Sequence, residues 1–197
     1  HEHGFLTVPT LLPHTAYLDG PFPQSHLIAA ALGARVTDTG DPLAVSAEPL
    51  IRDIGELPRI ETLDVTRSPL LQGLCRAIAE MAEITQGVIA FEPYLQHGPL
   101  DLAADVIGVQ KFYELTALDP EGAASLIRVC TDKWLDFRRA QERAANGRWA
   151  GRRFEPGCYY GDSLLENLPP DTVRELAVPM AARLAREYGG VVFGLGR

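Results

Sequence analysis

Five polar side chains that can bind ligands or move protons follow one short apolar segment. The run 88–91, VIAF, has the composition of a strand buried on both faces of a parallel sheet. An imidazole that follows such a strand can serve as a general acid or base. We therefore predict that His97 is catalytic. The side chains predicted to bind substrate beside it are Glu92, Tyr94, Asp101 and Asp105.

A second pair of polar groups stands at the end of another predicted strand, 158–160. Tyr160 and Asp162 are predicted to be catalytic, because α/β enzymes keep their chemistry at the carboxyl ends of strands. We expect these groups and His97 to gather at one rim. Two alternatives stay open. Asp162 is also suited to cap the turn that follows it, and the groups around His97 are also suited to cap a bend that faces solvent.

The sequence predicts no metal site. Metal ligands must converge in space, and nothing in the sequence brings His14, Asp19 and His26 together. The three cysteines lack the close spacing of a zinc site, and we interpret them as reduced thiols of a cytoplasmic protein.

The elements that must position these groups alternate between strand and helix. We predict strands at 35–38, 43–47, 88–91, 158–160 and 190–193. Helices are predicted at 26–32, 68–86, 99–108, 110–118, 119–146 and 170–188, with mostly connection at 49–58. Pro179 inside the last helix predicts a kink or a boundary. This order favours an α/β fold with a parallel sheet or barrel.

Composition restricts the partners. The chain of 197 residues has a net charge of −8, which argues against nucleic acid because phosphate binding needs a basic face. No apolar run approaches the roughly 20 residues that span a membrane. We expect a cytoplasmic protein whose partner is a small-molecule substrate.

From about residue 47 to residue 196, the order of these signals resembles the uroporphyrinogen decarboxylase superfamily, which includes corrinoid-linked methyltransferases. The matching pieces are EPLI at 48–51, HGPLDLAADVIG at 97–108, LDPE at 118–121, GDS at 161–163, LPP at 168–170, AVP at 177–179 and GLG at 194–196. The resemblance implies a (β/α)8 TIM-barrel-like fold with its active site at the carboxyl ends of the strands. It implies a decarboxylase, a carbon–carbon lyase, that acts on a carboxylated molecule such as a porphyrin. The alternatives are a corrinoid-dependent methyltransferase that acts on a methylated molecule, and a non-catalytic binding relative.

The resemblance also places family residues on this chain. Gln24 falls where the decarboxylases carry a catalytic aspartate, and it is predicted to bind substrate. Asp105 falls near their pocket tyrosine. The His-x-Cys zinc motif of the methyltransferases falls on FGL at 193–195, which lacks both ligands. We therefore predict no cofactor, and zinc or a corrinoid belongs only to the methyltransferase alternative.

The length of the chain bears on the barrel. A complete barrel needs about 250 residues, and the resemblance continues beyond the last strand of this chain. We therefore expect one domain, 1–197, that forms the N-terminal and middle part of a barrel. The strand edges of an incomplete barrel must be covered, which makes a homodimer possible.

Overall fold

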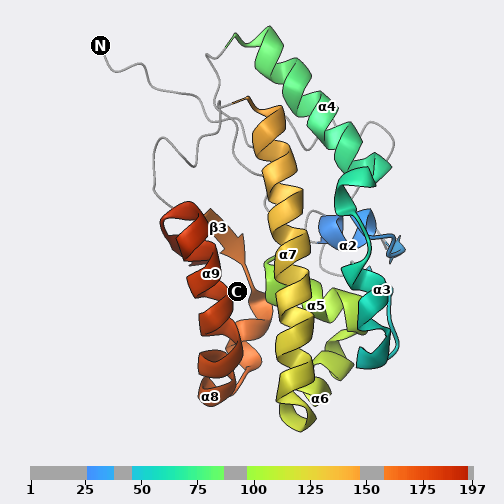
Figure 1. Cartoon of the computed structure of the whole chain (residues 1–197), viewed down its shortest axis with the longest axis vertical. Coiled ribbons are helices and arrows are strands. Elements are labelled where there is room, and N and C mark those ends of the chain that lie inside the picture. Colours follow the sequence, from blue (N-terminus) through green and yellow to red (C-terminus); the bar gives the residue numbers. More distant parts are fainter. Residues whose placement is uncertain (1–25, 38–45, 87–96, 147–157, 195–197) are drawn as a thin grey trace.

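The long helix α7, Pro120–Ala144, runs through the middle of the molecule (Figure 1). The computed structural model describes residues 26–37, 46–86, 97–146 and 158–194, with 158–160 and 191–194 described by their backbone alone. Helix α7 begins where Asp119 accepts a 2.9 Å hydrogen bond from the backbone N–H of Gly122 and Pro120 supplies the first turn. Apolar residues at three- and four-residue spacing form one buried stripe along α7: Ala123, Leu126, Ile127, Cys130, Trp134 and Phe137.

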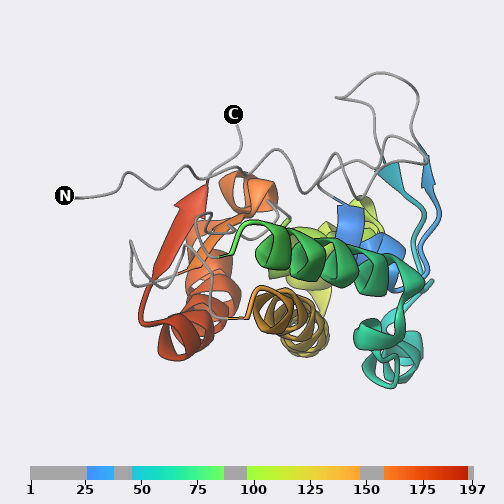
Figure 2. The same ribbon diagram turned by 90° about the horizontal axis from the view of Figure 1, so that it is seen from above.

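Two amphipathic helices pack against α7 on different sides (Figure 2). Helix α4, Pro69–Ile84, buries Leu71, Leu74, Ile78 and Ala82 at three- and four-residue spacing. Helix α9, Val178–Tyr188, follows a π-helical turn, η6, at Val173–Ala177. Pro179 lies in the first turn of α9, so the predicted boundary at this proline is confirmed. Among the described residues, no helix is both long and apolar enough to cross a membrane.

Shorter helices complete the described chain. They are α2 at Leu27–Ala31, α3 at Leu57–Glu61, α6 at Val109–Leu118 and α8 at Pro170–Thr172. Three 3-10 turns join them: η2 at Ile54–Glu56, η3 at Val65–Arg67 and η5 at Ser163–Asn167. We predicted mostly connection at 49–58. This prediction was wrong for residues 54–58, which are helical and belong to η2 and the start of α3. Asp53 starts this helical segment by accepting a hydrogen bond from the backbone N–H of Gly55.

Helix α5, Pro99–Ile107, is buried along its whole length and packs against α7. The burial includes two carboxylates, Asp101 and Asp105, that lie one turn apart. A buried carboxylate needs a partner, so other segments must meet both residues. This helix therefore positions the candidate site.

The described strands form two separate pairs. Strands β1, Val36–Thr37, and β2, Ser46–Ala47, pair antiparallel, whereas β3, Cys158–Gly161, and β4, Val191–Gly194, pair parallel. The described chain is mostly helical and does not show the closed barrel that the resemblance implies. The strand predicted at 88–91 lies outside the described residues. His97 nevertheless forms a parallel bridge with Gly161, so the two predicted polar strand ends meet.

Candidate functional site

Asp105 is the centre of a cluster that joins three distant segments. Its Oδ2 atom lies 2.9 Å from Nδ1 of His26, at the start of α2. Since an ionised carboxylate can only accept, the His26 imidazole donates this hydrogen bond. The two residues are 79 positions apart in sequence, and both side chains are largely buried.

His97 lies between the two carboxylates of α5. Its Nδ1 atom is 3.8 Å from Asp105 Oδ2, and its Nε2 atom is 3.8 Å from Asp101 Oδ2. The ring of His26 meets the ring of His97 edge to face, with centroids 5.0 Å apart. Trp134 of α7 donates a 3.1 Å hydrogen bond from Nε1 to the His97 carbonyl oxygen. The core helix therefore fixes the backbone from which this imidazole projects.

Asp101 and Asp162 cap each other's helices. Oδ1 of Asp162 accepts hydrogen bonds from the backbone N–H groups of Leu100 and Asp101, at 3.1 and 3.0 Å, at the start of α5. In return, Asp101 accepts hydrogen bonds from the backbone N–H and hydroxyl of Ser163, at 2.9 and 2.8 Å, and from the N–H of Leu164 at 3.0 Å. The exchange satisfies orphan donors at both helix starts and locks α5 to the segment after β3.

The buried carboxyl groups of Asp105 and Asp162 have pKa values shifted in opposite directions. Burial alone would raise the pKa of Asp105, but the His26 hydrogen bond and the nearby His97 ring hold that pKa below its ordinary value. Burial raises the pKa of Asp162 well above its ordinary value, and the Asp101 carboxylate raises it further against the two backbone hydrogen bonds. Asp105 is therefore disposed to stay ionised, and Asp162 is disposed to hold a proton.

We predict that Asp162→Asn keeps the fold and removes a pH dependence of stability. Asparagine retains an oxygen that can accept from Leu100 and Asp101. Because the folded carboxyl holds its proton more tightly than the unfolded one, native Asp162 stabilises the fold fully below its unfolded pKa, about 3.9, and loses this contribution as pH rises toward its raised folded pKa. Urea unfolding of both proteins from pH 4 to 8 should show a steeper decline for the native chain.

Asp162→Ala is the matched variant for the cap itself. It removes the acceptor, so it should lower the free energy of unfolding by about 1–2 kcal/mol. Equal pH slopes for the native chain and Asp162→Asn would show that the Asp162 carboxyl keeps an ordinary pKa.

The structure brings together four of the residues predicted from the sequence: His97, Asp101, Asp105 and Asp162. The open alternative for Asp162 was that it caps the turn after it. This alternative was wrong, because the Asp162 side chain makes no cap hydrogen bond to that turn and caps the start of α5 instead. Gln24, Glu92 and Tyr94 lie outside the described residues, and Tyr160 is described by its backbone alone in β3.

His26 is the member that sequence reasoning missed. It was considered as a metal ligand only with His14 and Asp19, which lie outside the described residues. The sequence did contain one signal for such a partner. Asp105 is a carboxylate in the apolar helix PLDLAADVI, and a buried carboxylate needs a partner from another segment.

The cluster can perform two kinds of chemistry. An imidazole held beside carboxylates can accept and return a proton, as general acid–base catalysis requires. Two imidazoles and a carboxylate are also a common ligand set for transition metals. Of the described residues, the group suited to a metal is His26, His97 and Asp105.

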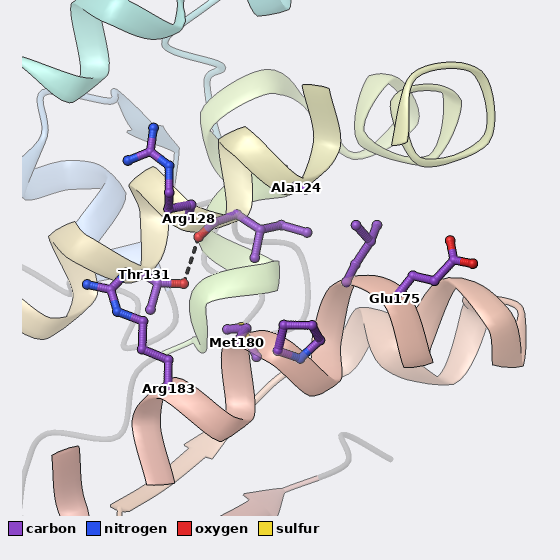
Figure 3. Close-up of a pocket in the computed structure, with 9 residues that line it drawn as sticks. Ala124, Arg128, Thr131, Glu175, Met180 and Arg183 are labelled. Carbon is purple, nitrogen blue, oxygen red and sulfur yellow. Dashed lines mark hydrogen bonds between the residues drawn. The ribbon is translucent and has the colours of Figure 1, made fainter. Parts of the chain in front are cut away.

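A half-open groove lies between α7 and the segment formed by η6 and α9 (Figure 3). Its volume of about 170 Å³ is below the range of small-molecule pockets, and none of the cluster residues lines it. The hydroxyl of Thr131 on its wall is already bonded to the backbone oxygen of Ile127 at 2.7 Å (Figure 3). We therefore assign the candidate site to the cluster and not to this groove.

No family model matches the chain, and no curated protein sequence matches it. Among solved structures, the chain is similar to a methyltransferase from Methanosarcina mazei, with a TM-score of 0.67 and 15% sequence identity. The similarity covers 88% of this chain and 49% of the methyltransferase. The chain therefore spans about half the length of that structure, and over most of its own length it shares the methyltransferase's fold.

Proposed function

We propose that this chain forms part of a (β/α)8-barrel methyltransferase that methylates a small molecule beside His97. The observation that carries this proposal is the likeness of fold to the Methanosarcina methyltransferase. The parallel pairs β3–β4 and His97–Gly161 support a barrel, because the strands of such barrels run parallel. The chemistry of the cluster supports the choice of reaction.

Methyl transfer fits the cluster better than decarboxylation. A decarboxylase must hold an anionic substrate and stabilise developing negative charge with positive or hydrogen-bonding groups. The surroundings of His97 instead contain the carboxyl groups of Asp101 and Asp105. Carboxylates next to a substrate carboxylate disfavour its charged form, so they oppose this kind of binding.

His97 is proposed as the proton acceptor. A thiol acceptor reacts as its thiolate, so its proton must leave before or during the transfer. The His97 imidazole takes that proton, and the Asp101 and Asp105 carboxylates stabilise the resulting imidazolium. The acceptor sulfur then bonds to the methyl carbon, and the bond from that carbon to the donor breaks with both electrons left on the donor. The donor substrate that the resemblance implies is a methylated corrinoid.

The zinc motif that the resemblance implies does not fit its expected place. Phenylalanine, glycine and leucine at 193–195 carry no side-chain atom that binds zinc. No zinc is therefore assigned to that strand.

The proposal is tested by methyl transfer from methylcobalamin to a small thiol, followed through the absorbance change of the corrinoid. We predict transfer by the full chain and a loss of about 10²–10⁴-fold in rate for His97→Ala, the range of a general base. A shift of the pH–rate profile should accompany the loss, because the proton acceptor is gone.

Glu83→Gln on the exposed face of α4 is the control, and its rate should match that of the native chain. Binding of the thiol or corrinoid without any transfer would favour the non-catalytic alternative. Release of carbon dioxide from a carboxylated substrate would restore the decarboxylase.

A further inference from the structure

Three residues from distant segments place metal-binding atoms close together. His26 starts α2, His97 forms the parallel bridge with Gly161, and Asp105 lies in α5. One ligand atom from each lies within 4.8 Å of the other two. Metal ligands must converge in space, and the spacing of these residues in the sequence could not show that they do.

Two of the three separations between ligand atoms lie close to the value expected around a bound ion. With bonds of 2.0–2.1 Å in tetrahedral geometry, neighbouring ligand atoms lie about 3.3 Å apart. The distances from Asp105 Oδ2 to the Nδ1 atoms of His26 and His97, 2.9 and 3.8 Å, lie on either side of that value. Small side-chain rotations would equalise them, and the proton between His26 and Asp105 would be released as the ion replaced it.

The burial of His97 Nδ1 points to a missing partner. This atom is buried, and within the described part of the chain it has no hydrogen-bond partner. A buried polar atom left unpaired costs about 1–3 kcal/mol. An ion between the three side chains would satisfy this nitrogen.

The surroundings of His97 also match those of metal-bound histidines. Such histidines almost always donate their other ring N–H to a carboxylate, a carbonyl or water, which fixes the ring. On the opposite edge of His97, Nε2 lies 3.8 Å from Asp101 Oδ2, close enough to become a hydrogen bond after a small movement. Asp101 is itself held by Ser163 and Leu164.

We propose that His26, His97 and Asp105 bind one divalent first-row transition-metal ion, of which zinc suits two imidazoles and a carboxylate best. Three protein ligands leave at least one position for water or substrate, as in catalytic zinc sites. Metal binding stands on this geometry alone. Its role rests on the proposed function. With the ion on Nδ1 and Asp101 on Nε2, His97 would have no nitrogen left to accept a proton, and the ion would instead favour loss of the thiol proton by lowering the pKa of the acceptor.

The test is titration of the chelator-treated full chain with Co²⁺, followed by displacement with Zn²⁺. We expect one ion per chain, visible absorption bands of a low-symmetry cobalt site, and loss of these bands when Zn²⁺ is added. His97→Ala and Asp105→Asn should each weaken Co²⁺ binding at least about 100-fold, and Asp101→Asn about 10–100-fold.

Asp136→Asn on α7 is the matched control, since it removes a half-exposed carboxylate outside the cluster, and it should bind Co²⁺ like the native chain. Far-ultraviolet circular dichroism identifies any variant that fails to fold, and Asp105→Asn, which keeps the shape of the side chain, then decides. Absence of saturable binding, or equal binding by native chain, His97→Ala and Asp105→Asn, would overturn the site. Metal binding without methyl transfer would overturn only the proposed function, and methyl transfer without metal binding would overturn only this inference.

Discussion

Gly98→Ala is expected to lower the free energy of unfolding by about 3 kcal/mol, the sum of an overpacked core and a lost helix cap. A Cβ atom on Gly98 would lie 2.5 Å from the Cγ and Oδ2 atoms of Asp162. The backbone of Gly98, with φ −71° and ψ 179°, is open to any residue, so the requirement for glycine is steric.

Asp162 cannot move aside without cost. It is fully buried, and its Oδ1 atom accepts from the N–H groups of Leu100 and Asp101. Displacement would break both bonds and would separate the start of α5 from the segment that Asp101 caps. Equilibrium unfolding in urea measures the loss, and the change in midpoint should come without a change in slope.

Gly73→Ala is the control for the substitution itself. Gly73 lies within α4, and its added Cβ would meet nothing nearer than the Arg76 side chain at 3.9 Å. Alanine there should raise stability by about 0.5–1 kcal/mol, because glycine is the poorer helix former. Combining Gly98→Ala with Asp162→Ala should cost clearly less than the sum of the two single changes, since the second removes the clashing atoms. Strict additivity would refute the steric explanation.

Features of the fold that depend on neighbouring residues could be predicted from the sequence. Asp119 and Pro120 start α7 through a local hydrogen bond and a fixed backbone angle. Pro179 sets the junction between η6 and α9 in the same way, because it cannot continue a regular helix. The buried stripe of α7 followed from three- and four-residue spacing alone.

Features that depend on pairing between distant segments could not be predicted. The exchange of caps between Asp101 and Asp162 joins residues 61 positions apart, and each carboxylate alone fits an ordinary local cap. Arg138, in the second half of α7, is buried against the rings of Trp134 and Tyr188, with guanidinium-to-ring distances of 5.5 and 4.7 Å. Trp134 lies four residues before Arg138 on the same helix, but Tyr188 comes from α9, so only tertiary packing reveals the second ring.

In the candidate site, too, contacts between residues close in sequence could be predicted, and contacts between distant segments could not. Asp101 and Asp105 could be placed on one helix face, because residues four apart are neighbours on a helix. Their convergence with His97 followed from the position of His97 just before that helix. His26 arrives from another segment, and no periodicity or motif in the sequence links it to Asp105.

Trp134→Ala should cost about 3–5 kcal/mol of stability, because it removes a fully buried aromatic side chain from the middle of α7. Trp134→Phe keeps most of the packing but removes the N–H that binds the His97 carbonyl at 3.1 Å. This milder variant should cost about 1–3 kcal/mol, the penalty for a buried acceptor left unpaired. It should also weaken Co²⁺ binding about tenfold, because the backbone that carries His97 is no longer fixed from the core.

Phe137→Leu is the control that separates the positioning of His97 from the stability of the core. Phe137 is as deeply buried on the same helix, but its side chain has no donor for the His97 carbonyl. The variant should unfold at a lower urea concentration than the native chain and bind Co²⁺ with unchanged affinity. Trp134→Phe and Phe137→Leu are compared at equal loss of stability. If both weakened Co²⁺ binding equally, the loss of affinity would come from general loosening of the core. A loss of affinity confined to Trp134→Phe would show that the hydrogen bond from α7 positions His97 for its ligand.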